Sequence, residues 1–234
     1  MGLEALNQVH QQTLSDKVAH SLKEAILNGE LRPGSHLKTQ SIAEQMGVSL
    51  APVREAIAQL VERGLVESRP YRGAFVAELT PQDAKDLYVL RSAIEGLGGR
   101  LAAERTRPED LEPLRRALRE MEEALAANDY VRYASLGIHF HGKIVSLAGN
   151  CMLEELWSKL ASQTRLSLTV TWPKYSHLHQ ANEHQLCLDA IASGDGDYAE
   201  QVMREHLVNF SQKVLFGAEG GETLGEEVMA GSET

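Results

Sequence analysis

Apolar residues recur at three- and four-residue spacing through most of the chain, the pattern of helices that bury one face. The first such stretch covers 12–28, and Asn28-Gly29 ends it. A shorter stretch at about 40–46 closes at Gly47, because glycine tolerates the left-handed conformation that ends many helices. A third helix is predicted from Ser49, as N-cap, to about Arg63. The chain therefore opens with three short helices.

A hairpin is predicted directly after these helices. Pro52 falls in the first turn of the third helix, where a missing N–H costs nothing. Residues 65–68 and 74–77 then read as strands on either side of the turn residues 69–73. Three helices followed by a hairpin predict a winged helix-turn-helix, which we place at residues 10–78.

Helical spacing returns after Thr80-Pro81, a cap followed by a proline at the first helical position, and no strand pattern follows it. The pattern predicts an all-α bundle over residues 81–217, so the expected fold class is mostly α. Its expected helices are 81–105, 108–127, 129–148, 150–170, 177–193 and 196–216. Proline, glycine and asparagine mark the breaks between them, for example Trp172-Pro173.

The composition narrows the class of protein. Residues 218–234 are rich in Gly and Glu and poor in apolar side chains, so we expect a disordered acidic tail. The two cysteines, Cys151 and Cys187, have no metal-type spacing, which favours core thiols in a reducing compartment. No signal-type segment and no apolar run of membrane-spanning length occurs. A cytoplasmic protein without membrane contact is expected.

The net charge of −10 is unevenly distributed along the chain. Residues 81–234 contain 15 Lys/Arg and 24 Asp/Glu, whereas residues 32–73 contain six Lys/Arg and four Asp/Glu. An acidic chain can therefore still carry a small head that binds DNA.

The third helix has the parts of a DNA-reading helix. Ser49 and the helix start can hold a phosphate, and Arg54, one turn in, can reach a phosphate or a guanine edge. Arg69 and Arg72 on the hairpin can reach the minor groove. The plainer alternatives are that Ser49 only caps the helix and that Arg54 pairs with a surface carboxylate.

Several short motifs carry a family resemblance. They are Leu31-Arg-Pro-Gly-Ser-His-Leu, Ile42-Ala-Glu-Gln-Met-Gly-Val-Ser49, Pro52-Val-Arg-Glu-Ala56, Gly64-Leu-Val and Arg72-Gly-Ala-Phe-Val76. Over residues 14–77 the chain resembles the head of GntR-family bacterial transcription regulators. The resemblance implies that Ser49, Arg54 and the wing around Arg72-Gly73 touch double-stranded operator DNA. One departure is that Leu50-Ala51 stand where the family commonly has Arg-Thr, so fewer base contacts are expected.

Histidines gather in the C-terminal part of the chain. Six of the nine lie between residues 139 and 206: His139, His141, His177, His179, His184 and His206. Imidazoles from different helices of a bundle can converge on one metal ion. A helical histidine taken singly is more often a surface or satisfied core residue.

The surrounding residues add a second resemblance. Phe140-His141 before Ala148-Gly149-Asn150, Glu183-His184 before Leu188-Asp-Ala-Ile191, and Met203-Arg-Glu-His206-Leu207 are similar to the FCD effector domain of FadR-like GntR regulators. The resemblance covers about 83–216. It implies that His141, His184 and His206 are ligands of a divalent metal, zinc- or nickel-like, beside a small carboxylate effector.

The family's fourth ligand, an aspartate, is replaced by Gly137. His139 cannot take its place, because two residues along a helix point roughly 200° apart. The alternatives are a three-histidine site completed by water or effector, a weakened site, or no metal. We favour the three-histidine site, since three neutral imidazoles suffice for zinc-like ions when solvent takes the open position.

Arg91 corresponds to an arginine that faces the pocket in the family, where a guanidinium can grip a carboxylate. The alternative is an ion pair with Glu95 on the same helix. Arg165 is a weaker pocket candidate.

These features predict a homodimeric, ligand-responsive bacterial transcription regulator rather than an enzyme. A small organic acid would bind in the bundle and change how the two heads sit on operator DNA. The rivals are a metal sensor, in which the ion is the signal, and a metal-dependent hydrolase, for which no general base with persuasive spacing is present.

Overall fold

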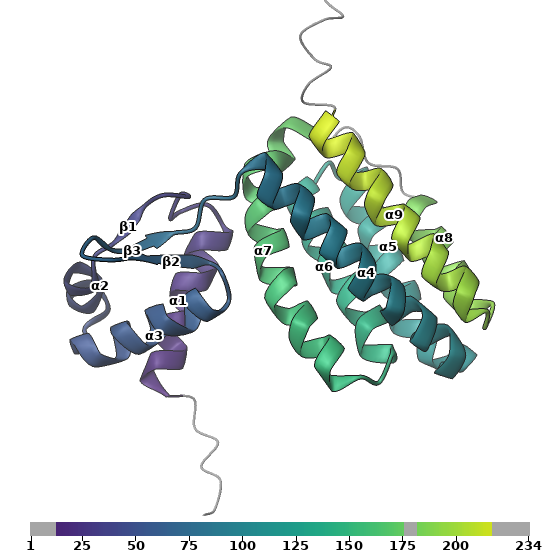
Figure 1. Cartoon of the computed structure of the whole chain (residues 1–234), viewed down its shortest axis with the longest axis horizontal. Coiled ribbons are helices and arrows are strands. Elements are labelled where there is room, and N and C mark those ends of the chain that lie inside the picture. Colours follow the sequence, from purple (N-terminus) through teal and green to yellow (C-terminus); the bar gives the residue numbers. More distant parts are fainter. Residues whose placement is uncertain (1–12, 176–181, 217–234) are drawn as a thin grey trace, which may run out of the picture. The chain divides into compact units, whose positions relative to one another are not determined.

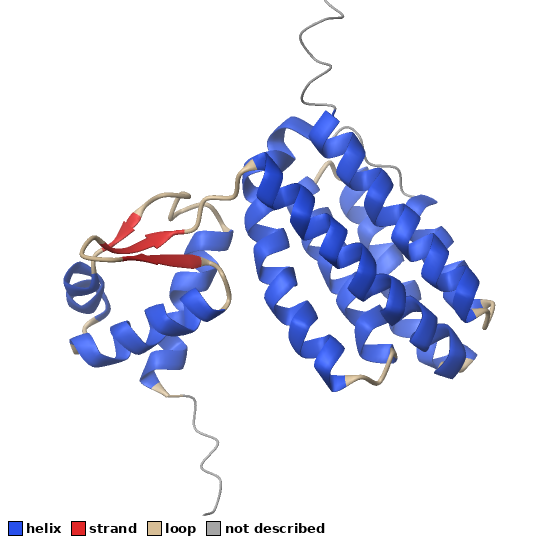
Figure 2. Ribbon diagram, viewed as in Figure 1, coloured by secondary structure: helices blue, strands red, loops and turns tan. Residues whose placement is uncertain are grey.

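The computed structural model describes residues 13–175 and 182–216. The chain divides into two compact units between Glu78 and Leu79. The first combines helices with a small sheet, and the second is helical (Figures 1 and 2). The predicted acidic tail, 218–234, lies outside the described residues.

The N-terminal unit contains the three predicted helices and the predicted hairpin. The helices are α1 (Leu14–Leu27), α2 (Thr39–Met46) and α3 (Leu50–Glu62), and the hairpin strands are β2 (Val66–Arg69) and β3 (Gly73–Val76). Thr13 and Asp16 form a capping box that satisfies backbone donors at the start of α1. Gly47 ends α2 in the left-handed conformation, as the sequence predicts.

A third strand, β1 (His36–Leu37), was not predicted from the sequence. It pairs antiparallel with β3, so the strand order is β1-β3-β2. A two-residue strand carries no readable alternation. It forms here because β3 offers its second edge and because the His36 ring stacks on Phe75, with 4.6 Å between ring centroids.

The hairpin turn depends on its glycine. Gly73 has φ +95°, and a Cβ on it would lie 2.8 Å from His36 Nε2. A larger residue would therefore be strained in its backbone and would push the stacked His36 ring away. The core of the unit is apolar: Val18, Ile26, Val53, Leu60, Leu65 and Val76 are all buried.

The C-terminal unit is the predicted bundle. Its helices are α4 (Pro81–Arg105), α5 (Glu112–Ala126), α6 (Tyr130–Leu147), α7 (Cys151–Tyr175), α8 (Asn182–Ala192) and α9 (Gly196–Phe216), with a 3₁₀ turn at Pro108–Leu111 before α5. Fully buried Leu114, Phe140, Ile144, Ile191 and Met203 centre its core. Among the described residues, no helix combines the length and apolar character needed to cross a membrane.

Two predicted boundaries differ from the structure, and a third cannot be compared with it. The predicted helix 108–127 begins instead as a 3₁₀ turn, because Pro113 lacks the N–H that would bond to the Glu109 carbonyl in a continuous α-helix, and the Glu112 N–H bonds to that carbonyl instead. Helix α7 continues past the predicted end at 170 to Tyr175. Pro173 stands in its last turn, where it removes one backbone hydrogen bond without ending the helix. The predicted helix 177–193 is described only from Asn182, since 176–181 lie outside the described residues.

Helix α4 is the central element of the bundle. It packs most extensively against α9 and also contacts α6, α7 and α8. Glycines permit the close approach: a Cβ on Gly99 would lie 2.7 Å from Met203 Cγ and 3.3 Å from the Ala199 carbonyl oxygen. This packing places α4 beside α6 and α9, the helices that carry His141 and His206.

Candidate functional site

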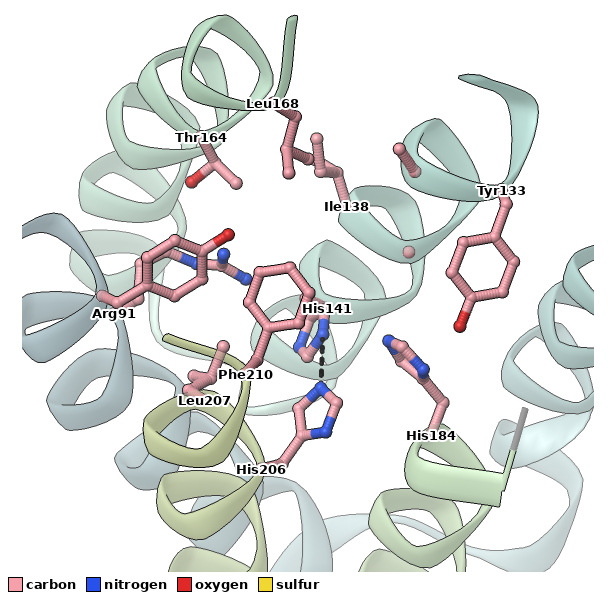
Figure 3. A pocket seen from close by; sticks show the side chains of 13 residues that line it. Arg91, Tyr133, Ile138, His141, Thr164, Leu168, His184, His206, Leu207 and Phe210 are labelled. Carbon is pink, nitrogen blue, oxygen red and sulfur yellow. Dashed lines mark hydrogen bonds between the residues drawn. The ribbon is translucent and has the colours of Figure 1, made fainter. Parts of the chain in front are cut away.

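Three buried histidines from three helices face one another in the bundle. His141 lies on α6, His184 on α8 and His206 on α9, and Figure 3 shows their rings turned toward a common point. One ring nitrogen from each lies within 4.8 Å of the other two. The structure therefore brings together all three residues that the sequence proposed as metal ligands.

The spacing of these nitrogens fits a metal centre. His206 Nε2 and His141 Nε2 lie 3.3 Å apart. In a tetrahedral zinc site with Zn–N bonds of about 2.0–2.1 Å, the nitrogens stand about 3.3–3.4 Å from each other. Two imidazole nitrogens can approach this closely when a proton or a cation lies between them. Three neutral imidazoles are a donor set suited to zinc-like ions.

Glu95 of α4 orients the first of these histidines. Its Oε2 lies 2.6 Å from His141 Nδ1, which directs the other ring nitrogen, Nε2, toward His206. Burial acts to raise the pKa of Glu95, but Arg91 and His141 together hold it down to about 2. Sequence reasoning treated Glu95 only as a helix partner of Arg91 and missed its contact with α6.

Arg91 forms the ion pair with Glu95 and also lines the pocket. It is 3% exposed, and its Nε donates to Glu95 Oε1 at 2.7 Å. Its guanidinium lies over the rings of Tyr88 and Trp157, at 4.9 and 5.2 Å from their centroids. It also lines the same pocket as the three histidines. The helix pair and the pocket position are therefore compatible.

Gly137 leaves space beside the histidines. It lies on α6 one turn before His141 and lines the pocket. A Cβ built on it would meet only Met121 Cε at 3.7 Å and His184 Nε2 at 3.8 Å, both ordinary contacts. The position could thus hold a ligand side chain, and this chain provides none. His139 is exposed on the same helix, as the angle argument predicts.

The pocket is small and mostly apolar apart from the groups above. About 50 Å³ of it is accessible to the centre of a water molecule, room for a few waters or a small molecule. Tyr133, Ile138, Thr164, Leu168, Leu207 and Phe210 complete much of its wall. The lining does not include Arg165, which is half-buried one residue after Thr164 on α7. The wall therefore gives no support to a pocket role for Arg165.

The head presents its candidate DNA contacts on α3 and the wing. Ser49 is the N-cap of α3, but its hydroxyl makes no capping hydrogen bond, so the plainer alternative for this residue is not supported. Ser49 and Arg54 are both exposed. Both can therefore reach a ligand at the start of α3, whose backbone N–H groups favour an anion.

The two wing arginines differ. Arg69 forms ion pairs with Glu67 at 3.2 Å and Glu78 at 3.5 Å and lies over the Phe75 ring. Arg72 is exposed, and no ion pair is found for it among the described residues. Arg72 is thus the more available cation. Tyr71, at the tip between them, is fully exposed with φ +60°, a residue that sequence reasoning overlooked.

A winged head joined to a helical domain whose pocket gathers three histidines and an arginine is the architecture of a ligand-responsive transcription regulator. Comparisons with known proteins support this class. Residues 14–76 match the model of bacterial regulatory proteins of the gntR family, and residues 86–209 match the FCD domain. The chain belongs to the GntR family of transcriptional regulators with an FCD domain.

Individual relatives support the assignment to the GntR family. The chain is 30% identical to the probable D-xylose utilization operon transcriptional repressor of Paenarthrobacter nicotinovorans, covering 85% of this chain and 87% of the relative. It is 31% identical to the regulator LutR of Bacillus subtilis, covering 82% and 96%. A GntR regulator from Rhodococcus sp. RHA1 superimposes with a TM-score of 0.74 at 29% identity, covering 87% and 98%. These relatives are transcription regulators, and the hydrolase alternative is set aside.

Proposed function

We propose that His141, His184 and His206 hold a divalent, zinc-like ion and that a small organic acid binds beside it as the effector. The observation that carries the proposal is the mutual approach of three buried imidazoles within 4.8 Å. When bound, the ion would supply a positive charge and open coordination positions. Gly137 adds no protein ligand, so water or an effector oxygen would complete the site.

The charges around the site favour an anionic ligand. Glu95 neutralises Arg91 through the 2.7 Å contact, and three neutral imidazoles leave the charge of a divalent ion uncompensated. Burying such a charge is costly unless an anion is paired with it. Arg91 donates its Nε–H to Glu95 and also pairs with Tyr88, and its two terminal nitrogens carry four N–H donors in a planar fork. A carboxylate beside the ion would satisfy both groups.

We further propose that the protein acts as a homodimer on operator DNA in the cytoplasm. Helix α4 exposes Val89, Leu90, Ala93 and Leu97, which share one face at helical spacing, and neighbouring α7 exposes Met152 and Leu156. Apolar stripes of this kind mark protein interfaces. A two-fold dimer would match the symmetry of a palindromic operator.

Regulation would follow from thermodynamic linkage between effector binding in the pocket and DNA binding by the head. An effector changes DNA affinity only as far as it binds the free and the DNA-bound protein with different affinity. Calorimetric titration of both forms tests this directly. Equal effector affinity for both would contradict effector-controlled binding.

Metal content is the experiment that tests the site. Elemental analysis of purified protein should find about one zinc-like ion per chain in the wild type and a clear loss in His184→Ala. A thermal-shift screen of small carboxylates should stabilise the wild type more than the variant, because the acid binds partly through the ion. His139→Ala, at an exposed position on α6, is the matched control and should keep its metal.

Two results would change the proposal. Absence of metal in both proteins, with an acid-dependent shift that survives His184→Ala, would leave Arg91 as the anchor of a metal-free site. Operator binding that requires metal but no organic acid would instead identify a metal sensor. The close approach of the three buried histidines is the observation that favours this second function.

A further inference from the structure

The exposed face of α3 has an unusual chemical make-up. Residues Leu50, Ala51, Arg54, Glu55 and Ala58 are all exposed and repeat at helical spacing on one side of the helix. The opposite side, with Val53, Ala56 and Leu60, is fully buried in the core of the head. The face that can enter a DNA groove therefore has hydrocarbon at its first two positions and a single cation one turn later.

The beginning of α3 is the part closest to base edges in a helix-turn-helix complex, because the N-terminal residues of the recognition helix contact the bases. Leu50 is 42% exposed there, at the first position of the helix. Ser49 beside it keeps its hydroxyl out of the helix cap and can fasten the helix start to a phosphate. Leu50 would thus be held against a base edge rather than against solvent.

Among the major-groove edges, only thymine presents a methyl group, and apolar side chains contact it. A leucine placed against a guanine or cytosine edge would instead cover polar atoms without replacing their hydrogen bonds to water. We propose that Leu50, with Ala51 beside it, reads thymine methyl groups in the operator and so determines sequence specificity. The proposal rests on the DNA-binding function of the family and adds which chemical group of the DNA is recognised.

The test begins with an operator selected by the full-length protein. Random duplex DNA is enriched for binding, with and without added Zn²⁺, and the consensus is determined. Each thymine of the consensus is then replaced singly by uracil, which removes only the 5-methyl group, and Kd is measured by fluorescence anisotropy at fixed salt. Uracil at one or two positions per half-site should weaken binding about fourfold. This change corresponds to roughly 0.8 kcal/mol, the free energy of burying one carbon group.

Variants show whether Leu50 is the residue responsible. Leu50→Ala should bind the thymine operator more weakly and lose its sensitivity to uracil at the same positions. Leu14→Ala is the matched control, because Leu14 is an exposed leucine (51%) that lies away from the start of α3. It begins α1, and its neighbour Asp16 accepts a hydrogen bond from Gln59 near the opposite end of α3. It should keep both the affinity and the uracil effect. Leu50→Arg should select guanine at the thymine position.

The outcomes separate this inference from the function on which it rests. A uracil effect that disappears in Leu50→Ala supports it. A selected operator whose affinity does not change with uracil at any thymine, or changes equally in wild type and Leu50→Ala, overturns the inference and leaves DNA binding intact. Failure to enrich any sequence, with or without Zn²⁺, would contradict sequence-specific DNA binding itself and the inference with it.

Discussion

Glu95 connects the two functional groups of the pocket, because one carboxylate contacts Arg91 through Oε1 and His141 through Oε2. A carboxylate that accepts from the outer nitrogen of a ligating histidine fixes the ring and raises its basicity. Glu95 also holds Arg91, whose guanidinium lies over the rings of Tyr88 and Trp157. The pocket is therefore organised from α4, although the three histidines lie on other helices.

Replacing Glu95 tests this role. In Glu95→Gln we expect metal affinity to fall roughly 10- to 100-fold, the usual range for such supporting groups, as measured by competition with a chromophoric chelator. Glu183→Gln is the control, because Glu183 Oε2 stands 4.0 Å from His206 Nδ1 and the side chain is partly exposed. A smaller change is expected there. Equal affinities in wild type and Glu95→Gln would mean that Glu95 serves only Arg91.

Gly137 offers the opposite experiment, the addition of a ligand. Gly137→Asp should tighten metal binding by at least about tenfold and weaken the response to carboxylates, because the new side chain occupies the open position. Gly137→Ala is the matched control. It should leave metal affinity unchanged and raise the free energy of unfolding by about 0.5–1 kcal/mol, since alanine suits a helix interior better than glycine. Chelator competition and thermal unfolding measure the two effects, and a weaker site in Gly137→Asp would contradict the geometry.

Helix α4 is organised by its glycines, which allow α9 to approach closely. In Gly99→Ala the new Cβ would meet Met203 Cγ at 2.7 Å and the Ala199 backbone at 3.3 Å. We expect destabilisation of about 1–3 kcal/mol from overpacking, measured by urea unfolding. Gly96→Ala is the comparison, because the three atoms nearest its Cβ belong to the Arg204 side chain, which can move. A neutral or small effect is expected there, and equal losses at both positions would contradict the distinction between a rigid contact at Gly99 and a yielding one at Gly96.

Assembly of the whole molecule depends, in our proposal, on the apolar face of α4. Leu97→Glu introduces a charge at a position that is 40% exposed, and the variant should sediment as a monomer. Its affinity for a palindromic operator should fall, while affinity for a single half-site stays unchanged. Leu186→Glu, at a 57% exposed position on α8, is the control and should remain a dimer. A dimeric Leu97→Glu would place the interface elsewhere.

The helices and the three histidines could be predicted from the chain because each rests on short-range information. Helix α4 has the predicted bounds Pro81–Arg105, set by the Thr80 cap and Asp83. The motifs around His141, His184 and His206 carried the family resemblance. Strand β1 and the end of α7 were missed, since a two-residue strand depends on its partner and a proline near a helix end is not decisive.

Local spacing along the chain was sufficient to predict a three-helix head with a hairpin and a separate helical domain, because capping and periodicity act over a few residues. The candidate ligands followed from the family resemblance. The contact between Glu95 and His141, the 3.3 Å approach of His141 and His206 and the space beside Gly137 were decided by tertiary packing. These features join residues 46 to 65 positions apart or depend on the close approach of helices that meet only in the folded bundle. The chemistry of the site is therefore a property of how α4, α6, α8 and α9 pack together.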